Sequence, residues 1–134
     1  MKTYDVFRKT TENIRVTVIP AFMGIQSKEY WWRYCIRLEN LGTETVQLRQ
    51  REWRIYPRAG APMRVRGRGV VGEEPILSPE YPFYQYSSQV SLQSTCGYMG
   101  GIYTMEGQDQ RQFEVKIPNF SLESKLNFDP ANEV

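Results

Sequence analysis

The sequence predicts an all-β fold, an antiparallel β-sandwich of about seven strands. Apolar residues recur with a period of two, as in strands with one buried face, and no stretch keeps the 3.6-residue period of a helix. Turn signals rich in Gly, Pro and Asn separate these short segments at close spacing. With 134 residues, the chain is long enough to form one domain with a hydrophobic core and is short for a protein of two domains.

Two amphipathic strands open the predicted sandwich. Residues 14–18 alternate Ile and Val with Arg and Thr, and Pro20 and Gly24 end this pattern. Residues 30–39 predict a longer strand with unusually large side chains, followed by a turn at residues 40–43. One face of this strand carries Trp32, Tyr34, Ile36 and Leu38, and the other carries Trp31, Arg33, Cys35 and Arg37.

The next strand, residues 46–56, changes the side on which its apolar residues fall. Val46 and Leu48 occupy even positions, whereas Trp53 and Ile55 occupy odd positions. A regular strand cannot turn both sets to one face, because its side chains alternate strictly. We therefore expect a β-bulge or a break at residues 49–52, which lets Trp53 join Trp32 in the core.

The second half of the chain predicts four more strands, at residues 63–68, 83–90, 98–105 and 113–117. Gly100 and Gly101 leave room for a bulky neighbour, and Pro118 closes the last strand. We expect a flexible segment at residues 1–10 and a loosely held polar tail at residues 123–134. The domain itself is then residues 11–122.

Composition narrows the chemistry that is available. The chain has no histidine, which excludes the usual Ser-His-Asp and Cys-His catalysis and removes the commonest transition-metal ligand. Two scattered cysteines, Cys35 and Cys96, cannot build a tetrahedral zinc site, and they favour a reducing compartment over a disulfide framework. No apolar run approaches the roughly 20 residues of a membrane helix. We expect no enzymatic activity, no cofactor, no bound metal and no membrane contact.

A glycine-rich segment at residues 67–72 matches G-x-G-x-x-G, a pattern found in phosphate-binding loops. In a dinucleotide site such glycines follow a strand and open a helix, whose N-terminus meets the phosphate. Here they lie among β-type segments and soon reach a proline, so a turn or bulge is the favoured interpretation. The alternative is a site for a phosphate-containing ligand, a nucleotide or pyrophosphate, formed by Arg66, Gly67, Arg68, Gly69 and Gly72.

Basic residues are concentrated in one region of a nearly neutral chain. The formal net charge is +2, but residues 49–68 contain seven arginines and one acid. These arginines are either a solvated strand face, which is the favoured interpretation for most of them, or a docking surface for an acidic partner or nucleic acid. Trp31 has the opposite parity to Trp32, so it is either loop-covered or an exposed binding anchor. The candidate partner-binding residues are Trp31, Arg33, Arg51 and Arg54.

Direct nucleic-acid binding is not expected. The overall charge is close to neutral, and residues 106–134 contain six acids against three bases. These acids oppose broad contact with a phosphate backbone. A protein partner is the favoured alternative.

Several segments, taken in order along the chain, resemble the ApaG domain family. They are residues 12–16, 30–34, 37–40, 53–55, 67–72, 84–88 and 117–120. The resemblance extends over residues 11–122 and implies a sandwich of the fibronectin-type-III or immunoglobulin-like kind. It also implies a domain without established enzymatic activity, which occurs in small bacterial proteins and in eukaryotic adaptors.

Within that family the chain is most similar to the branch found in polymerase-associated adaptors. That resemblance implies protein partners in DNA replication and repair or in mitochondria, and a mitochondrial or nuclear location. In that branch another domain normally precedes this one. The sequence thus predicts a non-catalytic protein-protein interaction module of an adaptor, with phosphate-ligand binding as the alternative and the oligomeric state left open.

Overall fold

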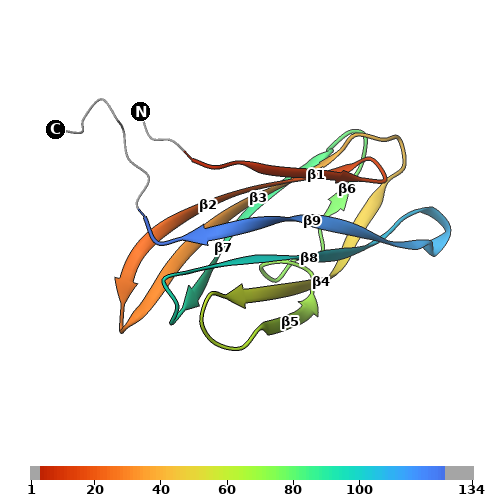
Figure 1. The fold of residues 1–134 in the computed structure, drawn as a ribbon. Helices are drawn as coiled ribbons and strands as arrows, with labels where there is room; N and C mark the ends of the chain where they lie inside the picture. The colour runs from red at the N-terminus through yellow and green to blue at the C-terminus, as the bar shows by residue number, and fades with distance from the viewer. Residues whose placement is uncertain (1–3, 126–134) are drawn as a thin grey trace, which may run out of the picture.

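The computed structural model describes residues 4–125, which form two antiparallel sheets packed as a sandwich (Figure 1). The all-β prediction is confirmed. The strands are β1 (Phe7–Thr11), β2 (Ile14–Gln26), β3 (Glu29–Asn40), β4 (Val46–Pro57), β5 (Met63–Arg68), β6 (Ile76–Leu77), β7 (Phe83–Leu92), β8 (Cys96–Glu106) and β9 (Gln112–Glu123). A short 3-10 turn, η1 (Gln108–Gln110), joins β8 to β9. Within residues 4–125, no helix has the length and apolar character needed to cross a membrane.

The four-stranded sheet has the order β1-β2-β3-β7, and the five-stranded sheet has the order β5-β4-β8-β9, with β6 also paired to β4. Along one side of the sandwich β1 lies against β9, and the Lys116 amide donates a hydrogen bond to Thr11 Oγ1. On the other side, β7 ends the four-stranded sheet and β5 ends the five-stranded sheet. Only the first of these sides is therefore closed by strands of both sheets.

Two strands were not expected from the sequence. β1 begins within residues 1–10, where we expected a flexible segment, and it pairs with β2 from Phe7 opposite Val18. The Phe7 ring packs against Phe120, with 6.2 Å between the ring centroids. β1 has a single apolar residue, so it shows no alternation. The other addition, β6, is only two residues long and falls in a connection between prolines.

The core lies between the sheets and contains the residues selected by the period-two pattern. Ile14, Val16 and Val18 are fully buried, and both Trp32 and Trp53 are buried as predicted. The core includes residues of every strand from β2 to β9 except β5, together with Val70 from the connection between β5 and β6. Its apolar character on both inner faces holds the two sheets together, because burial of apolar area is the main favourable term in folding.

The predicted irregularity in β4 is a β-bulge. The register with β8 shifts between Leu48 and Gln50, so that Arg49 is an extra residue. This insertion returns Trp53 to the inward face that Leu48 occupies before the bulge. The parity change in the sequence therefore has the physical cause that was expected.

The C-terminal end of β9 is fixed to β3. The indole Nε1 of Trp32 donates to the backbone oxygen of Glu123, with an N···O distance of 2.9 Å. Glu123, expected in the polar tail, is thus the last residue of a strand. Residues 1–3 and 126–134, where the rest of the expected flexible ends falls, lie outside the described residues.

Candidate functional site

The glycine-rich segment forms a tight turn. Val70 and Glu73 exchange two backbone hydrogen bonds, each with an N···O distance of 2.8 Å. Between them, Val71 and Gly72 have φ values of +44° and +81°. Positive φ at both central positions is the mark of a type I′ turn, which joins antiparallel segments. The chain then continues into Pro75 and β6, so the segment is a turn, as the favoured interpretation held.

The backbone amides of this turn are already used. Gly69 donates to the carbonyl of Arg49 at 2.9 Å, while Val70 and Glu73 donate to each other. A phosphate-binding loop needs amides that converge on a ligand. Here the amides of Gly69, Val70 and the adjacent Glu73 are directed at backbone carbonyls instead. The guanidinium of Arg68 is also engaged, with Glu74 at 3.0 Å.

The side chain of Arg51 stabilises this turn by hydrogen bonds to its backbone. It lies on the inward face of β4 with Trp53, and its Nη1 donates to the carbonyls of Arg68 at 2.9 Å and Gly69 at 2.8 Å. A Cβ atom at position 67 would stand only 2.7 Å from Arg51 Nη1. The absence of a side chain at Gly67 therefore makes room for the guanidinium. Arg51 therefore serves the architecture of the turn.

The inner end of this arrangement is a buried pair of tyrosines. The hydroxyls of Tyr86 and Tyr103 lie 2.6 Å apart. Burial is the main cause that raises the pKa of each phenol, and the positive charge of Arg51 acts in the opposite direction on both. Both hydroxyls therefore stay protonated at neutral pH. Neutral, mutually hydrogen-bonded phenols have a structural role in the core.

The outward face of β4 carries a different cluster, centred on Glu52. Only 10% of the Glu52 side chain is exposed. Its Oε1 accepts from Arg66 Nε at 2.7 Å and lies 3.1 Å from Arg64 Nη2, and its Oε2 lies 2.7 Å from Arg54 Nη2. The hydrogen bond from Arg66 is the main cause that holds the pKa of Glu52 below its ordinary value. One carboxylate thus orients three arginines on the surface.

A groove lies beside this cluster on the outer surface of the five-stranded sheet. The rings of Tyr56 and Tyr98 stack at its side with 4.8 Å between centroids. Gly100 and Gly101 line it, at the point where the register of β8 with β9 shifts, and they add no side chains to fill it. The groove has a volume of about 460 Å³. It is therefore a shallow, partly aromatic surface bounded by cations.

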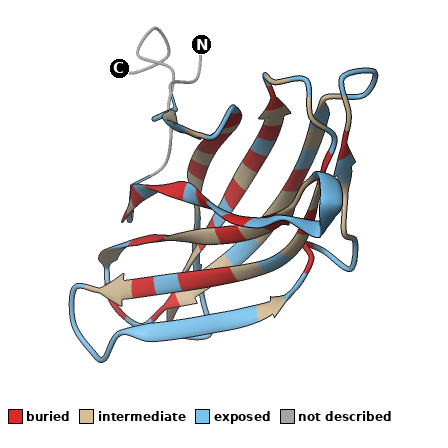
Figure 2. Cartoon of the chain, turned by 90° about the vertical axis from the view of Figure 1, so that its right-hand side faces the viewer, coloured by how far each residue is buried: buried red, intermediate tan, exposed pale blue. Residues whose placement is uncertain are grey.

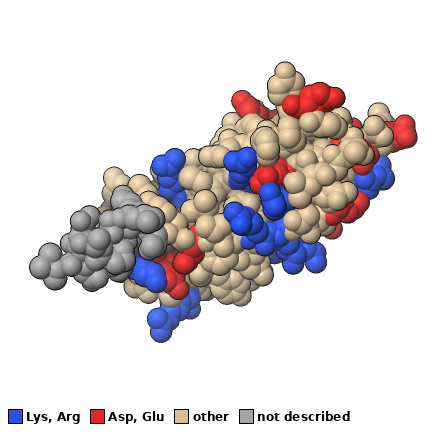
Figure 3. All heavy atoms as spheres, turned by 90° about the horizontal axis from the view of Figure 1, so that it is seen from above, with Lys and Arg blue, Asp and Glu red and all other residues tan. Residues whose placement is uncertain are grey.

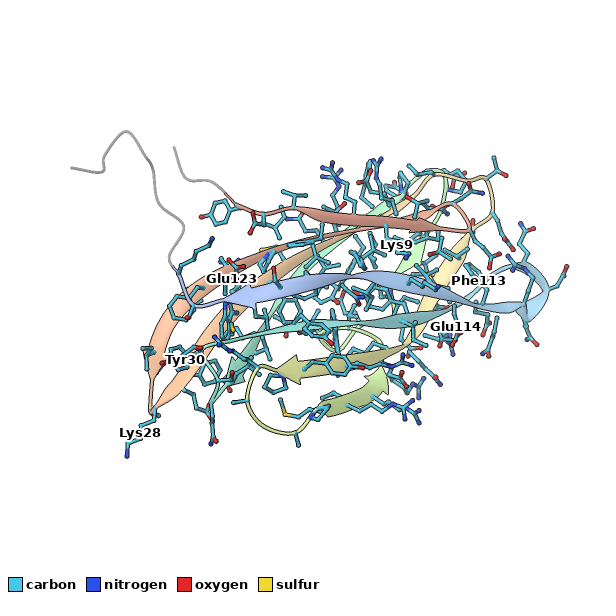
Figure 4. All side chains as sticks on the ribbon, viewed as in Figure 1. Lys9, Lys28, Tyr30, Phe113, Glu114 and Glu123 are labelled. Carbon is cyan, nitrogen blue, oxygen red and sulfur yellow. The ribbon has the colours of Figure 1, made fainter. Side chains whose placement is uncertain are left out.

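Three cations line the groove, Lys9, Arg54 and Lys116. Arg64 and Arg66 share the Glu52 carboxylate with Arg54, and we call these five residues the basic face. Figure 4 shows Lys9 between the ribbons of β1 and β9, with Glu114 farther along β9. In the view of Figure 3, Lys and Arg side chains run along the middle of the molecule, and acidic side chains gather toward one end. Among residues 4–125, neither Lys9 nor Lys116 has a carboxylate within ion-pair distance.

The four residues predicted to bind a partner do not form one surface. Trp31 and Arg33 lie on the outer face of the four-stranded sheet, where Trp31 Nε1 donates to the Gln26 carbonyl and Arg33 donates to Ser87 Oγ. Arg51 lies under the glycine turn, and Arg54 lies on the opposite sheet in the basic face. Arg54 is thus the one predicted partner-binding residue that belongs to the basic face.

Sequence reasoning missed most of this surface. Lys9 and Lys116 come from opposite ends of the chain, and only the contact between β1 and β9 brings them together. The sequence indicated the exposure of Tyr56 and Tyr98 only weakly. Both occupy positions that alternate with the buried residues of their strands, and such positions face outward. The spacing of Glu52 among arginines was visible, but the ion pairs depend on the register between β4 and β5.

Comparison with known proteins agrees with this fold. A family model described as the ApaG domain matches residues 23–107. Over 123 residues the chain is 43% identical to protein ApaG of Bradyrhizobium sp. (strain ORS 278), a match that covers 89% of this chain and 94% of that protein. The chain belongs to the ApaG domain family. The resemblance seen in the sequence is therefore confirmed.

Other ApaG domain relatives include longer proteins. The chain is 59% identical over 124 residues to human polymerase delta-interacting protein 2, a match that covers 90% of this chain but only 34% of that protein. It thus spans about a third of the length of that relative. Among solved structures, Northeast Structural Genomics Consortium target SoR45 matches with a TM-score of 0.80, 32% identity and 94% coverage of both chains. The putative ApaA protein from Bordetella pertussis matches with a TM-score of 0.77, 32% identity, and coverage of 92% of this chain and 96% of that one.

Proposed function

We propose that this ApaG domain is a non-catalytic protein-protein interaction module that docks an acidic protein surface on its basic face. The observation that carries the proposal is the Glu52 cluster. A single, nearly buried carboxylate holds three arginines whose side chains are 49–64% exposed. Cations fixed in this way lose little side-chain freedom when a partner binds, which favours affinity.

The residue types on this face suit a protein partner. Arg and Tyr are enriched among the residues that dominate protein interfaces, and here Tyr56 and Tyr98 lie beside Arg54. The whole surface is carried by paired strands, so it is displayed on a rigid scaffold. Within residues 4–125, no group of three or more His, Cys, Asp and Glu side chains could hold a metal ion. The role we assign is recognition without catalysis or a cofactor.

The adaptor role rests on a relative. One similar protein is named polymerase delta-interacting protein 2, and 59% identity over 124 residues supports a shared mode of action for this domain. We extend the proposal to an adaptor linked to DNA replication and repair, in the nucleus or in mitochondria. The free thiols of Cys35 and Cys96 are compatible with a reducing compartment.

Phosphate-ligand binding at residues 66–72 is disfavoured by the hydrogen bonding, although Arg66, Gly67 and Arg68 line an open groove of about 480 Å³. The amides of Gly69, Val70 and Glu73 are satisfied by backbone carbonyls, and Arg66 and Arg68 are paired with carboxylates. A bound phosphate would have to displace these partners. We therefore do not carry that alternative further.

The experiment measures binding of the full chain to purified DNA polymerase delta and to a capped oligo-glutamate peptide. The variant Lys9→Glu with Lys116→Glu reverses two charges of the basic face that make no ion pair within the described residues. We expect affinity for both probes to fall about tenfold. The matched control, Arg8→Glu with Lys28→Glu, makes the same charge change away from the basic face and should bind as the unchanged chain does. Equal binding by both variants would overturn the basic face as the docking surface. Stronger binding to a single-stranded oligonucleotide of the same charge would argue against a protein partner.

A further inference from the structure

The last strand of the four-stranded sheet, β7, has an unprotected edge. It pairs with β3 alone, in an unbroken register from Leu92 opposite Tyr30 to Phe83 opposite Glu39. Its ten residues, FYQYSSQVSL, contain no charge and no proline. Natural sheets usually protect edges with charges, prolines, bulges or short length. The other free edge, β5, follows this rule, because it has six residues and includes three arginines.

The register shows which backbone groups of β7 point outward. The Asn40 amide donates to the Pro82 carbonyl at 2.8 Å, one step beyond the pair of Glu39 and Phe83. In an antiparallel ladder, hydrogen-bonded pairs alternate along the strand. Even-numbered residues of β7 therefore bond to β3. The amides and carbonyls of Gln85, Ser87 and Gln89 point to the open edge, where no strand of residues 4–125 pairs with them.

Below this edge lies an uncovered apolar strip on β5. Val65 pairs with Trp53, and Met63 pairs with Ile55, so all four side chains face the space between the sheets. Trp53 and Ile55 are 4% and 6% exposed, whereas Val65 and Met63 are 43% and 42% exposed. Figure 2 shows β5, the lowest strand, as almost entirely exposed. The four-stranded sheet stops at β7, so it supplies no strand to cover β5.

Two arginines lie on the outer face next to this edge. Arg33 and Arg37 on β3 are both exposed, and their neighbours on β7 are Gln89 and Gln85. Arg33 reaches over β7 to donate to Ser87 Oγ at 3.2 Å, and within residues 4–125 it has no carboxylate partner. Arg37 stacks on the ring of Phe83 at 4.4 Å, and its Nε lies 3.5 Å from Glu39 Oε1. Acidic side chains just beyond β7 would therefore meet complementary charge, chiefly that of Arg33.

We propose that the edge of β7 binds an extended segment of a protein partner as an added strand of the four-stranded sheet. Because side chains of a strand alternate, the segment places apolar residues inward over Met63 and Val65 and acidic residues outward beside Arg33 and Arg37. A second copy of this chain would offer uncharged Gln and Ser side chains to these arginines, so it fits less well. The site uses the edge of β7 and the inward side of β5, and it shares no residue with the basic face.

The probe is a capped eight-residue peptide that alternates Val and Glu, added to the full chain. Backbone amide hydrogen exchange is measured by NMR. Addition of the peptide should slow exchange at Gln85, Ser87 and Gln89 by about tenfold or more, with little change at even-numbered residues of β7. The peptide in which Lys replaces Glu should bind at least several-fold more weakly.

Two substitutions at one position separate edge pairing from side-chain contacts. Ser87→Pro removes an amide that points to the open edge and leaves the ladder with β3 intact, so peptide affinity should fall about tenfold or more. Ser87→Ala keeps the amide and should bind as the unchanged chain does. If Ser87→Pro does not fold, Val65→Glu tests the apolar strip and should also lower peptide affinity about tenfold or more.

Unchanged exchange at the outward amides would overturn the proposal, as would equal binding by Ser87→Pro. A dimer that depends on Ser87 and excludes the peptide would identify a second copy as the occupant and would also overturn it. The Lys9→Glu with Lys116→Glu variant should still bind the alternating peptide. Failure of the basic face is thereby distinguished from failure of the β7 edge.

Discussion

Arg51 and Gly67 face each other across the β4–β5 pair, and the guanidinium of one occupies the space that a side chain of the other would need. Nη1 of Arg51 donates hydrogen bonds to two carbonyls of the following turn, those of Arg68 and Gly69. The glycine motif is therefore only one half of a structural unit. The other half is an arginine that lies 16 positions earlier in the chain.

This unit predicts that Arg51→Ala destabilises the domain. The substitution leaves two carbonyls without their charged donor, which costs on the order of 1–3 kcal/mol in unfolding free energy. Urea denaturation monitored by tryptophan fluorescence measures the loss. Arg33→Ala, on the opposite sheet, is the matched control and should change the free energy of unfolding by less than about 0.5 kcal/mol. Equal effects of the two substitutions would contradict the bracing role.

The type I′ turn predicts a stabilising substitution. Val71 has a φ of +44°, a region that β-branched residues rarely adopt, whereas Asn tolerates it. Val71→Asn should raise the free energy of unfolding by roughly 1 kcal/mol. Gly72→Ala should lower it, although no atom lies within 4 Å of the added Cβ, because φ there is +81°. Thermal unfolding measured by circular dichroism tests both, and a lower midpoint for Val71→Asn would contradict the turn.

The Glu52 cluster predicts a loss of stability in acid. Arginine contacts, led by the hydrogen bond from Arg66, lower the pKa of Glu52 in the folded state from its ordinary 4.5. A carboxyl with a lowered folded pKa contributes stability above its unfolded pKa, and the contribution is lost as pH falls through the folded value. Glu52→Gln should therefore reduce stability at neutral pH and flatten its decline below about pH 4.5. Glu114→Gln serves as the control, and an unchanged acid profile in Glu52→Gln would contradict the assignment.

The hydrogen bond from Tyr84 to Glu73 predicts a loss of stability at alkaline pH. Burial first, and then the hydrogen bond and negative charge of Glu73, raise the pKa of Tyr84 to about 12. The hydroxyl donates to Glu73 Oε2 at 2.8 Å. Because the folded state holds the proton more tightly, this stabilisation is present below the ordinary pKa of 10 and is lost as pH rises through 12. Glu73→Gln should lower the pKa of Tyr84, as measured by NMR titration of the tyrosine rings, and an unchanged value would rule out the coupling.

The fold was largely predictable, because strand alternation is a local property of the sequence. The changed parity from Leu48 to Trp53 predicted a bulge or a break at residues 49–52, and the bulge lies at Arg49. The same parity placed Arg51 on the inward side with Trp53, a signal that the charge of arginine obscured. The role of Arg51 then follows only from the β4–β5 register, which no local pattern specifies.

The basic face could not be predicted in the same way. Lys9 and Lys116 are brought together by the packing of β1 against β9, and β1 itself has only Phe7 as an apolar signal. Trp31 was correctly assigned to the side opposite Trp32, but its indole is tied to the Gln26 carbonyl within its own hairpin. Contacts between residues far apart in the sequence, such as Lys9 and Lys116, depend on how whole sheets are arranged in three dimensions.

The contact between Phe7 and Phe120 means that the polypeptide enters and leaves the described domain at neighbouring points. A unit with this layout can be inserted into, or joined to, a larger protein as a self-contained cassette. Flanking modules attached at either terminus would then extend from one corner of the sandwich. The charged groove and the unprotected strand could both remain accessible while such modules vary.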